Sequence, residues 1–457
     1  MSTVQETGAN GANCPEALAR AKGAVTASVA KVCKAGQASQ ASQAGAARRT
    51  LSPVAAFVGA ALTFVGVTFA AGAPSPLFVL YQQEWGFPAW VLTIAFAIYA
   101  ITLLVTLLIA GSLSDHIGRR PVLIGALALE IVSMLIFLFA QDIGWIIVAR
   151  AIQGVATGAA TGTFTAAIVE LAPEKHKKLG AVIGGTAPVG GLALGALITG
   201  AAVQFTAVPT VIIFSSLAVV FTLGIIVVAL SAETVSRRAG AVRSLIPRLT
   251  VPRAARAEFG AIVPVLIGTW MLAGLFLGLA PSIIRGVFHI DSGLVNGAIV
   301  ALQPAAGAVA GFVLSRVHAR TATIWGSASV VVGIAISVSA VAFGLLPLLF
   351  VGAVLGGAGF GAAFSGSLRI LAPLAPAHQR AELFAAVYLV NYLAYGVPAL
   401  IVGELIGVVG LLDAVIGYGI AAALATAVGL VVQLRRAHVV RSARPATGSV
   451  RVVAAAE

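Results

Sequence analysis

Charged residues cluster in the stretch AGSLSDHIGRRPVLIG, which lies between two long apolar runs. Asp115 supplies a carboxylate, and Arg119 and Arg120 supply guanidinium groups about one helical turn away. A carboxylate at a helix end can accept hydrogen bonds from the N-terminal amides of a neighbouring helix, where the dipole favours an anion. Gly111 would let two helices approach closely, and Gly118 would permit a tight reversal. A loop that only carries positive charge would need the arginines alone, so we interpret the cluster as an electrostatic switch.

Charged residues inside apolar runs form a second set of candidates. Arg150 lies in IIVARAIQGVATG, with Gln153 one helical turn away and Gly154 beside it. A charge inside a membrane span usually faces a cavity or a partner, so we expect Arg150 to bind substrate or to act on a nearby acid. The alternative is a structural arginine that bonds helix-end carbonyls. Glu130 and Glu404 are acids away from the cytoplasmic helix ends, and each is either a proton carrier or a structural partner.

Aromatic and amide side chains form a third set. The segment YLVNYLAY places Tyr388, Asn391, Tyr392 and Tyr395 on one face of a helix. The other candidates for substrate contact are Tyr99, Trp270 and Gln303. An aromatic, weakly polar cavity suits amphiphilic or cationic organic molecules and lacks the dense polar groups that a sugar requires. A seam between packed helices is the alternative for the same residues.

The composition requires a membrane around these residues. The chain has 457 residues, of which 60% are hydrophobic and 9% charged, and its mean hydropathy is +1.04. Soluble domains carry about a quarter charged residues, so a soluble globule is excluded. The net charge of +13 is assigned to cytoplasmic loops and not to nucleic-acid binding, because aromatic residues do not interleave with the basic ones. Cys14 and Cys33 lack metal-ligand spacing, and we expect no metal and no cofactor.

Long apolar runs predict an all-α polytopic membrane protein with twelve transmembrane helices in two six-helix bundles. The predicted spans are 53–81, 90–113, 122–140, 144–171, 179–204, 209–231, 260–284, 294–315, 322–343, 347–372, 381–407 and 411–434. The predicted domains are a disordered cytoplasmic tail (1–50), an N-terminal bundle (51–231), a cytoplasmic linker (232–258), a C-terminal bundle (259–434) and a basic cytoplasmic tail (435–457).

The basic residues give the orientation. With both termini in the cytoplasm, all but three of the 28 Lys and Arg residues fall in tails and cytoplasmic loops. Of the three exceptions, Arg150 lies inside a span, Arg369 lies at a cytoplasmic helix end, and Arg285 faces outward. The opposite orientation would leave nearly all of this charge outside.

The two halves resemble each other in sequence. GSLSDHIGRR at 111 aligns with GFVLSRVHAR at 311, and GAATGTFTAAIVELAPEKHKK at 158 aligns with GAAFSGSLRILAPLAPAHQRA at 361. Internal repeats of this kind are frequent in transporters. The second copy has Ser315 where the first has Asp115, so the intact switch belongs to the first half.

With this repeat, the chain after residue 50 resembles the major facilitator superfamily. The first loop matches that family's Gly-x-Leu-x-Asp-x-x-Gly-Arg-Arg/Lys signature between spans two and three, through Gly111, Leu113, Asp115, Gly118, Arg119 and Arg120. The resemblance implies that Asp115 meets the start of span eleven, near Ala381. It also implies that Arg119 pairs with Glu170 at the end of span four. The cluster would then latch the halves together on the cytoplasmic side.

Two further patterns resemble this family. Arg150, Gln153 and Gly154 fit its span-four pattern, where the arginine is associated with proton coupling or substrate contact. In span five, GGTAPVGGLALG contains Pro188, Gly190 and Gly191 and is expected to bend the helix. It departs from the Gly-Pro-x-x-Gly-Gly pattern of proton antiporters, because Ala187 replaces the first Gly and one residue separates Pro188 from Gly190. This departure weakens the inference of antiport.

The expected function is secondary active transport of a small organic solute across the cell membrane, by alternating access and most readily as proton-coupled export of a drug or metabolite. The alternative is a proton symporter that imports an organic acid or another metabolite. No His-Glu-x-x-His motif, phosphate-binding glycine loop or nucleophile elbow occurs, so we do not expect an enzyme. The expected partners are the substrate, protons and the lipid bilayer, with no nucleic acid, and the protein is expected to be a monomer.

Overall fold

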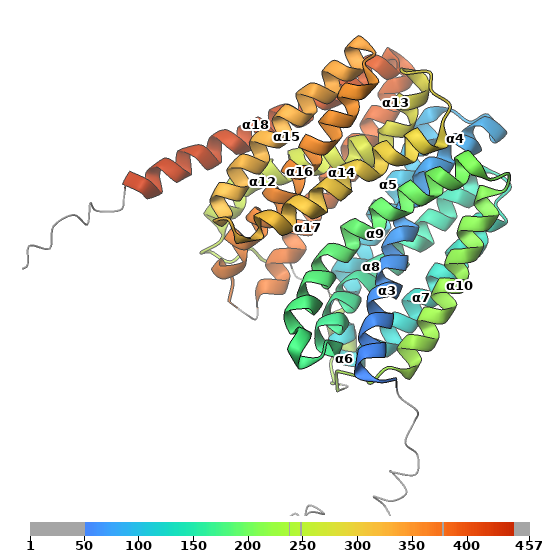
Figure 1. The fold of residues 1–457 in the computed structure, drawn as a ribbon. Coiled ribbons are helices and arrows are strands. Elements are labelled where there is room, and N and C mark those ends of the chain that lie inside the picture. The colour runs from blue at the N-terminus through green and yellow to red at the C-terminus, as the bar shows by residue number, and fades with distance from the viewer. Residues whose placement is uncertain (1–50, 237, 247–248, 377–378, 443–457) are drawn as a thin grey trace, which may run out of the picture. The chain divides into compact units, whose positions relative to one another are not determined.

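Long helices form wherever the sequence is continuously apolar, because only internal hydrogen bonds satisfy the backbone in lipid. The computed structural model describes residues 51–442 except 237, 247–248 and 377–378 (Figure 1). Within this part of the chain the secondary structure is helical, and 12 helices are long and apolar enough to cross a membrane. The predicted fold class is therefore confirmed. The expected tail 1–50 lies outside the described residues.

The first half contains six candidate spans. Its helices are α3 (Pro53–Gly72), α4 (Pro74–Trp85), α5 (Ala89–Ala110), α6 (Ser114–Ile117), α7 (Arg119–Leu138), α8 (Ile143–Leu171), η2 (Glu174–His176), α9 (Lys177–Phe205) and α10 (Pro209–Leu230). Helices α3 and α4 together make the first span, Pro53–Trp85. The short helix α11 (Ala241–Ser244) follows in the region between the halves.

The second half repeats this plan. Its helices are α12 (Arg256–Gly274), η3 (Leu275–Leu279), α13 (Ala280–Gly286), α14 (Gly293–Val313), η4 (Leu314–Arg316), α15 (Ala319–Phe343), α16 (Leu346–Leu371), η5 (Ala372–Leu374), α17 (Arg380–Val409) and α18 (Leu411–Ser442). The element η3 is a π-helical turn, so α12, η3 and α13 form one continuous span, Arg256–Gly286. Helix α18 continues beyond the span end expected at 434, so the start of the predicted basic tail is helical.

Local sequence explains where several spans begin and end. Asp142 caps α8, because its Oδ1 accepts hydrogen bonds from the backbone N–H groups of Gly144 at 2.7 Å and Trp145 at 3.2 Å. Pro209 occupies the first turn of α10, where its missing N–H has no partner to lose. Gly344 ends α15 in the left-handed conformation with φ 67°. Short turns of this kind keep consecutive spans antiparallel.

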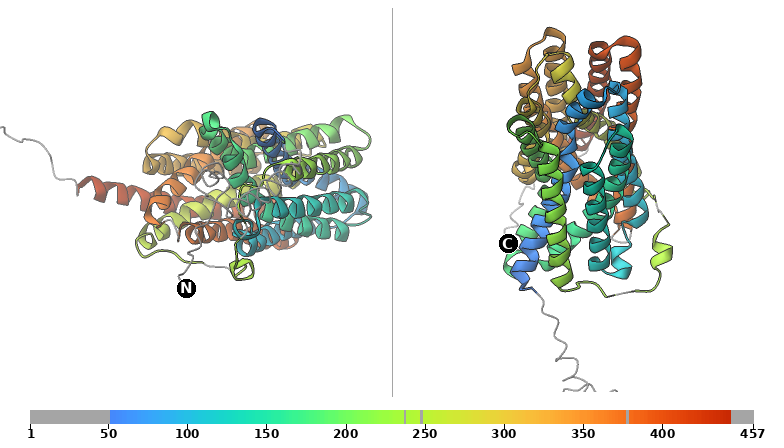
Figure 2. Two further views of the ribbon diagram at one scale, coloured as in Figure 1. Left: turned by 90° about the horizontal axis from the view of Figure 1, so that it is seen from below. Right: turned by 90° about the vertical axis from the view of Figure 1, so that its right-hand side faces the viewer.

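The two halves are packed together on the side opposite the linker. Helix α9 of the first half lies against α14 of the second, and α5 lies against α17 (Figures 1 and 2). Polar contacts cross the same boundary: the Ser75 hydroxyl donates to the Leu277 carbonyl at 3.1 Å, and the Ser292 hydroxyl lies 2.9 Å from Gln204 Oε1. By the charge distribution this is the extracellular side. The structure therefore represents a state that is closed to the outside.

Candidate functional site

The loop between the second and third spans is held by a charged cluster. Gly118 reverses the chain with φ 103°, a conformation that favours glycine. Arg119 follows at the start of α7 and pairs with Asp115 at 2.6 Å and with Glu170 at 3.1 Å. Its Nη1 also donates to the Ser114 hydroxyl at 2.6 Å. The structure thus brings together Asp115, Arg119 and Glu170 from three helices.

The region after span six completes this cluster, and the sequence analysis did not identify it. The Glu233 carboxylate accepts hydrogen bonds from the backbone N–H groups of Arg119 at 2.8 Å and Arg120 at 3.1 Å. It therefore occupies the N-terminus of α7, where an anion is favoured. The Thr234 hydroxyl donates to Glu170. The signal available in the sequence was an acid and a hydroxyl directly after a span, in a segment otherwise rich in arginine.

The remaining signature residues have local roles in this state. The Arg120 guanidinium donates to the carbonyl of Ala229 at the end of α10, which is a favourable position for a cation. A Cβ placed on Gly111 would have only Leu107 of the preceding turn within 4 Å. The close approach of a second helix expected at Gly111 is therefore not present here. The halves are separated at this side of the molecule, which accounts for the difference.

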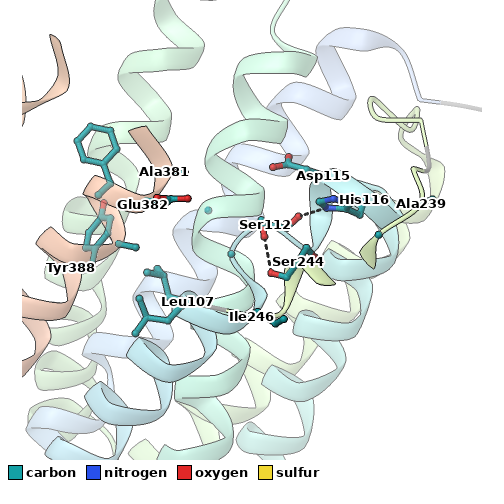
Figure 3. A pocket seen from close by; sticks show the side chains of 16 residues that line it. Leu107, Ser112, Asp115, His116, Ala239, Ser244, Ile246, Ala381, Glu382 and Tyr388 are labelled. Atoms are coloured by element: carbon teal, nitrogen blue, oxygen red, sulfur yellow. Dashed lines mark hydrogen bonds between the residues drawn. The ribbon is translucent and has the colours of Figure 1, made fainter. Parts of the chain in front are cut away.

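A cavity of about 710 Å³ opens beside the charged cluster, on the side of the linker. We call it the vestibule. Asp115 and His116 lie on one wall, and Glu382 and Tyr388 of α17 lie on the other (Figure 3). Among the described residues, no hydrogen bond or ion pair joins Asp115 to α17. The contact that the resemblance implied for Asp115 would form only after this gap closes.

Arg150 is fully enclosed in the first half and is 2% exposed. Its Nη1 donates to Gln153 Oε1 at 2.6 Å and to the Ala71 carbonyl at 3.4 Å, and its Nε donates to the Ala95 carbonyl at 3.4 Å. The guanidinium carbon lies 4.0 Å from the centre of the Tyr99 ring, a cation–π contact. Arg150 thus ties α8 to the first two spans, through a carbonyl near the end of α3 and one inside α5.

Gln153 and Gly154 support this arrangement. The Gln153 Nε2 donates to the Ala70 carbonyl at 2.8 Å, so both ends of its amide are bonded. A Cβ on Gly154 would lie 2.5 Å from the Tyr99 carbonyl oxygen, which means that only glycine allows α8 to approach α5 this closely. The three residues therefore act as one packed unit.

Glu130 lies on α7 in the same half, faces α8, and is 0% exposed. Its Oε1 accepts a hydrogen bond from the Thr157 hydroxyl at 2.9 Å, whereas its Oε2 has no partner among the described residues. Glu404, the other candidate acid, is exposed on α17 and does not belong to this network. The sequence left these two acids equivalent, and the structure distinguishes them because Glu130 is buried and Glu404 is exposed.

Trp270 of α12 organises the aromatic residues of the second half. Its ring centre lies 5.2 Å from Tyr392, 6.0 Å from Tyr395 and 5.8 Å from each of Phe360 and Phe364. Phe360 and Phe364 belong to α16 and were not identified from the sequence. We call these five rings the aromatic cluster.

Unpaired polar atoms lie in this half. Neither amide atom of Asn391 has a hydrogen-bond partner in the described part of the chain, and the residue is 0% exposed. The Gln303 Nε2 and the Trp270 Nε1 are likewise buried and unpartnered there. Native proteins leave few buried polar groups unpaired, so these atoms require an explanation.

Two regions with predicted residues remain, the second-half loop around Ser315 and span five. In the second-half loop Ser315 stands where the first half has Asp115. Arg369 of α16 donates there to the carbonyls of Ser315 and Val317, both at 2.7 Å. In span five, Pro188 lies inside the unbroken helix α9, and Gly191 packs against α3 at Thr68. Gly190 faces open space.

The family profile described as Major Facilitator Superfamily matches residues 57–348, well over half of the chain. The chain belongs to the major facilitator superfamily. It is therefore a secondary transporter and not an enzyme. No curated protein matches the sequence.

Solved structures of similar fold include two crystal structures of POT family transporters. The first is in complex with a thioalcohol-conjugated peptide and has a TM-score of 0.66 and 14% sequence identity. The second is in complex with 5-aminolevulinic acid and has a TM-score of 0.65 and 13% sequence identity. Each covers 84% of this chain and 96% of its own. At this identity the likeness shows the shared fold.

Proposed function

We propose that this superfamily member is a proton-coupled symporter that carries a small organic solute into the cell. The observation on which the proposal rests is the buried Glu130 carboxyl group, of which one oxygen is bonded by Thr157 and the other has no hydrogen-bond partner among the described residues. A buried carboxylate that bonds no cation directly is costly, so a carboxyl group retained here has a function that changes its proton occupancy. Glu130 is the proton site of the proposal.

Arg150 acts as the positioning residue for that site. A guanidinium stays protonated at any workable pH, so Arg150 does not itself carry the exchanged proton. Its contacts with Ala71, Ala95 and Gln153 join spans one, two and four around its fixed charge. Because Thr157 and Arg150 both lie on α8, a movement of this helix changes the hydrogen bond to Glu130 and the field at Glu130 together. Proton occupancy is thereby linked to the position of the helix.

The separation of two polar regions favours symport over exchange. Glu130 lies on α7 of the first half and faces α8, whereas Trp270, Gln303 and Asn391 lie on helices of the second half. Distinct sites allow a proton and a solute to be bound at the same time, which symport requires. In the simplest form of antiport the proton and the solute compete for one site. Glu130 and the solute-binding groups would then have to lie together.

Further support comes from the sequence and from the comparisons. The incomplete span-five pattern removes one feature of proton-driven exporters, and the part of span one predicted from the sequence, 53–81, contains no acid. The two similar structures hold a peptide conjugate and the metabolite 5-aminolevulinic acid. These findings favour the import alternative over the export function expected first from the sequence.

The gating part of the proposal concerns the vestibule. When the outer side opens and the vestibule closes, Asp115 approaches the N-terminus of α17, and the helix dipole stabilises the contact. Arg119, Glu170 and Glu233 hold the loop in the geometry that presents Asp115. The residues of the signature thus contribute to alternating access and not to solute binding.

Flux measurements on Glu130→Gln test the proton site. In proteoliposomes, the variant should lose accumulation driven by a pH gradient but retain exchange of labelled for unlabelled solute, because exchange needs no change in proton occupancy. Glu404→Gln is the matched control and should retain both activities, since Glu404 is exposed and outside the network. Gradient-driven accumulation by Glu130→Gln at the wild-type rate would refute the assignment.

A further inference from the structure

Asn391 has the environment of a ligand-binding amide. It is 0% exposed, and both its Oδ1 and its Nδ2 lack partners in the described part of the chain. By contrast, the buried Gln433 accepts from Arg320 at 3.2 Å and donates to the Ala261 carbonyl at 3.0 Å. A buried unpaired amide destabilises a fold, whereas one with both bonds made does not. Asn391 therefore differs from a structural amide in the same half.

A continuous face of α17 connects Asn391 to the vestibule. Ala381, Phe384, Ala385 and Tyr388 of this helix line the vestibule. The spacing of three and four residues continues inward through Asn391 and Tyr395, so these side chains lie on the same face one turn after another. Tyr388 lines the vestibule and Tyr392 belongs to the aromatic cluster, and their ring centres lie 6.5 Å apart. The face therefore passes from its open part to its enclosed part between these two residues. Asn391 lies about one helical turn beyond Tyr388, the last residue of α17 that lines the vestibule.

The surroundings of Asn391 define the chemistry of its ligand. Its neighbours on α17 belong to the aromatic cluster around Trp270, and those rings carry no charge. The fixed cation of the first half, Arg150, already bonds two carbonyls and Gln153. A ligand here finds flat apolar surfaces, the donor and acceptor of the Asn391 amide, the unpartnered Trp270 Nε1 donor, and no free countercharge. Flat, uncharged groups match such a surface best.

We infer that Asn391 determines specificity for a neutral, planar solute that carries a carboxamide or lactam. Such a group presents a C=O to the Asn391 Nδ2 and an N–H to its Oδ1, so one pair of hydrogen bonds satisfies both unpartnered atoms. The ring of the solute lies against the aromatic cluster. A carboxylate of the same shape offers no donor and brings an unpaired charge into this region. The inference rests on the proposed transport function and names the solute class for it.

Benzamide and benzoate are a matched pair of probes for this inference. Calorimetric titration of the purified full-length protein at fixed pH should show binding of benzamide and at least about tenfold weaker binding of benzoate, the scale of one unmet buried hydrogen bond. N,N-dimethylbenzamide, which keeps the carbonyl but lacks the N–H, should also bind more weakly. Equal or tighter binding of benzoate, or no binding of benzamide, would overturn the inference.

Two substitutions separate recognition from structure. Asn391→Leu removes the amide, so it should lose benzamide binding by about tenfold or more while its melting temperature stays equal or rises, because an unpaired buried polar group is removed. Gln433→Leu should show the reverse, with a lower melting temperature and unchanged binding, since its amide is fully bonded. Benzamide binding by Asn391→Leu with wild-type affinity would refute the role of Asn391. If Asn391→Leu does not accumulate in the membrane, the comparison of benzamide with benzoate on the wild type still tests the inference, because it needs no variant.

The binding and flux measurements can fail separately. Titration with benzamide at fixed pH tests solute recognition at Asn391, whereas gradient-driven flux in Glu130→Gln tests the proton site. If Glu130→Gln keeps gradient-driven flux and benzamide still binds through Asn391, the proton assignment fails and the solute class stands. If benzamide does not bind and Glu130→Gln loses only gradient-driven flux, the solute class fails and the coupling stands.

Discussion

The closed outer side depends on glycines, and Gly297→Ala tests this directly. Gly297 of α14 faces α9 of the first half. A Cβ at this position would lie 2.6 Å from the Ala196 carbonyl oxygen and 2.7 Å from Gly200 Cα. Carbon–oxygen contacts of this kind ordinarily measure about 3.3–3.6 Å, so the two helices must separate by about 0.7 Å or more. Both neighbours are backbone atoms, which do not rotate away.

The expected effect is a shift in population and not a failure to fold. Overpacking at one position costs about 1–3 kcal/mol, and here the penalty applies only to the state in which α9 and α14 touch. A differential free energy of that size changes the ratio of the two states by about 5- to 150-fold. Gly297→Ala should therefore favour the state that is open to the outside.

Cysteine labelling measures this ratio. The sequence contains only two cysteines, Cys14 and Cys33, so a background without them is available. Ala385→Cys, in the wall of the vestibule, should react more slowly with an impermeant maleimide in everted vesicles once Gly297→Ala is added. Gly417→Ala is the control, because nothing lies within 4 Å of a Cβ at that glycine. Equal labelling of parent and Gly297→Ala, with unchanged transport, would refute the reasoning.

Three further predictions concern the charged groups. Asp115→Asn should cripple transport while insertion and folding remain normal, because it removes the charge expected to meet α17; near-wild-type flux would contradict the switch. Arg150→Lys should fail in gradient-driven flux like Arg150→Ala, because an ammonium cannot replace a guanidinium that bonds two carbonyls and an amide; a response like the parent's would contradict this. Glu233→Ala should lower the melting temperature, because α7 loses its N-terminal anion; Glu174→Ala, on an exposed acid in η2, serves as its control.

The sequence predicts the fold well because the membrane limits the possibilities. Each span needs about 20 apolar residues, and long apolar runs with basic loops between them locate every crossing. The predicted span ends differ from the observed helix ends where the apolar run stops before the helix does. Helix α18 reaches Ser442 because its polar last turns still form internal hydrogen bonds beyond the apolar run.

The candidate site is predictable only where the chemistry is local in sequence. Arg150 and Gln153 are one turn apart, and their hydrogen bond follows from helical spacing. Glu233 lies more than a hundred residues from Arg119, and no periodic pattern indicates that contact. Glu130 and Glu404 look alike as isolated acids, and only packing distinguishes the buried one from the exposed one. The contact of Asp115 with span eleven depends on the state of the transporter, which sequence does not specify.

The direction of proton movement tests the central proposal most directly. Purified protein in proteoliposomes with an internal pH-sensitive dye is given an inward gradient of a compound that the wild type transports. Symport predicts that the lumen acidifies as the compound enters and that Glu130→Gln abolishes this signal while exchange continues. Alkalinisation of the lumen during uptake would show antiport and contradict the proposal.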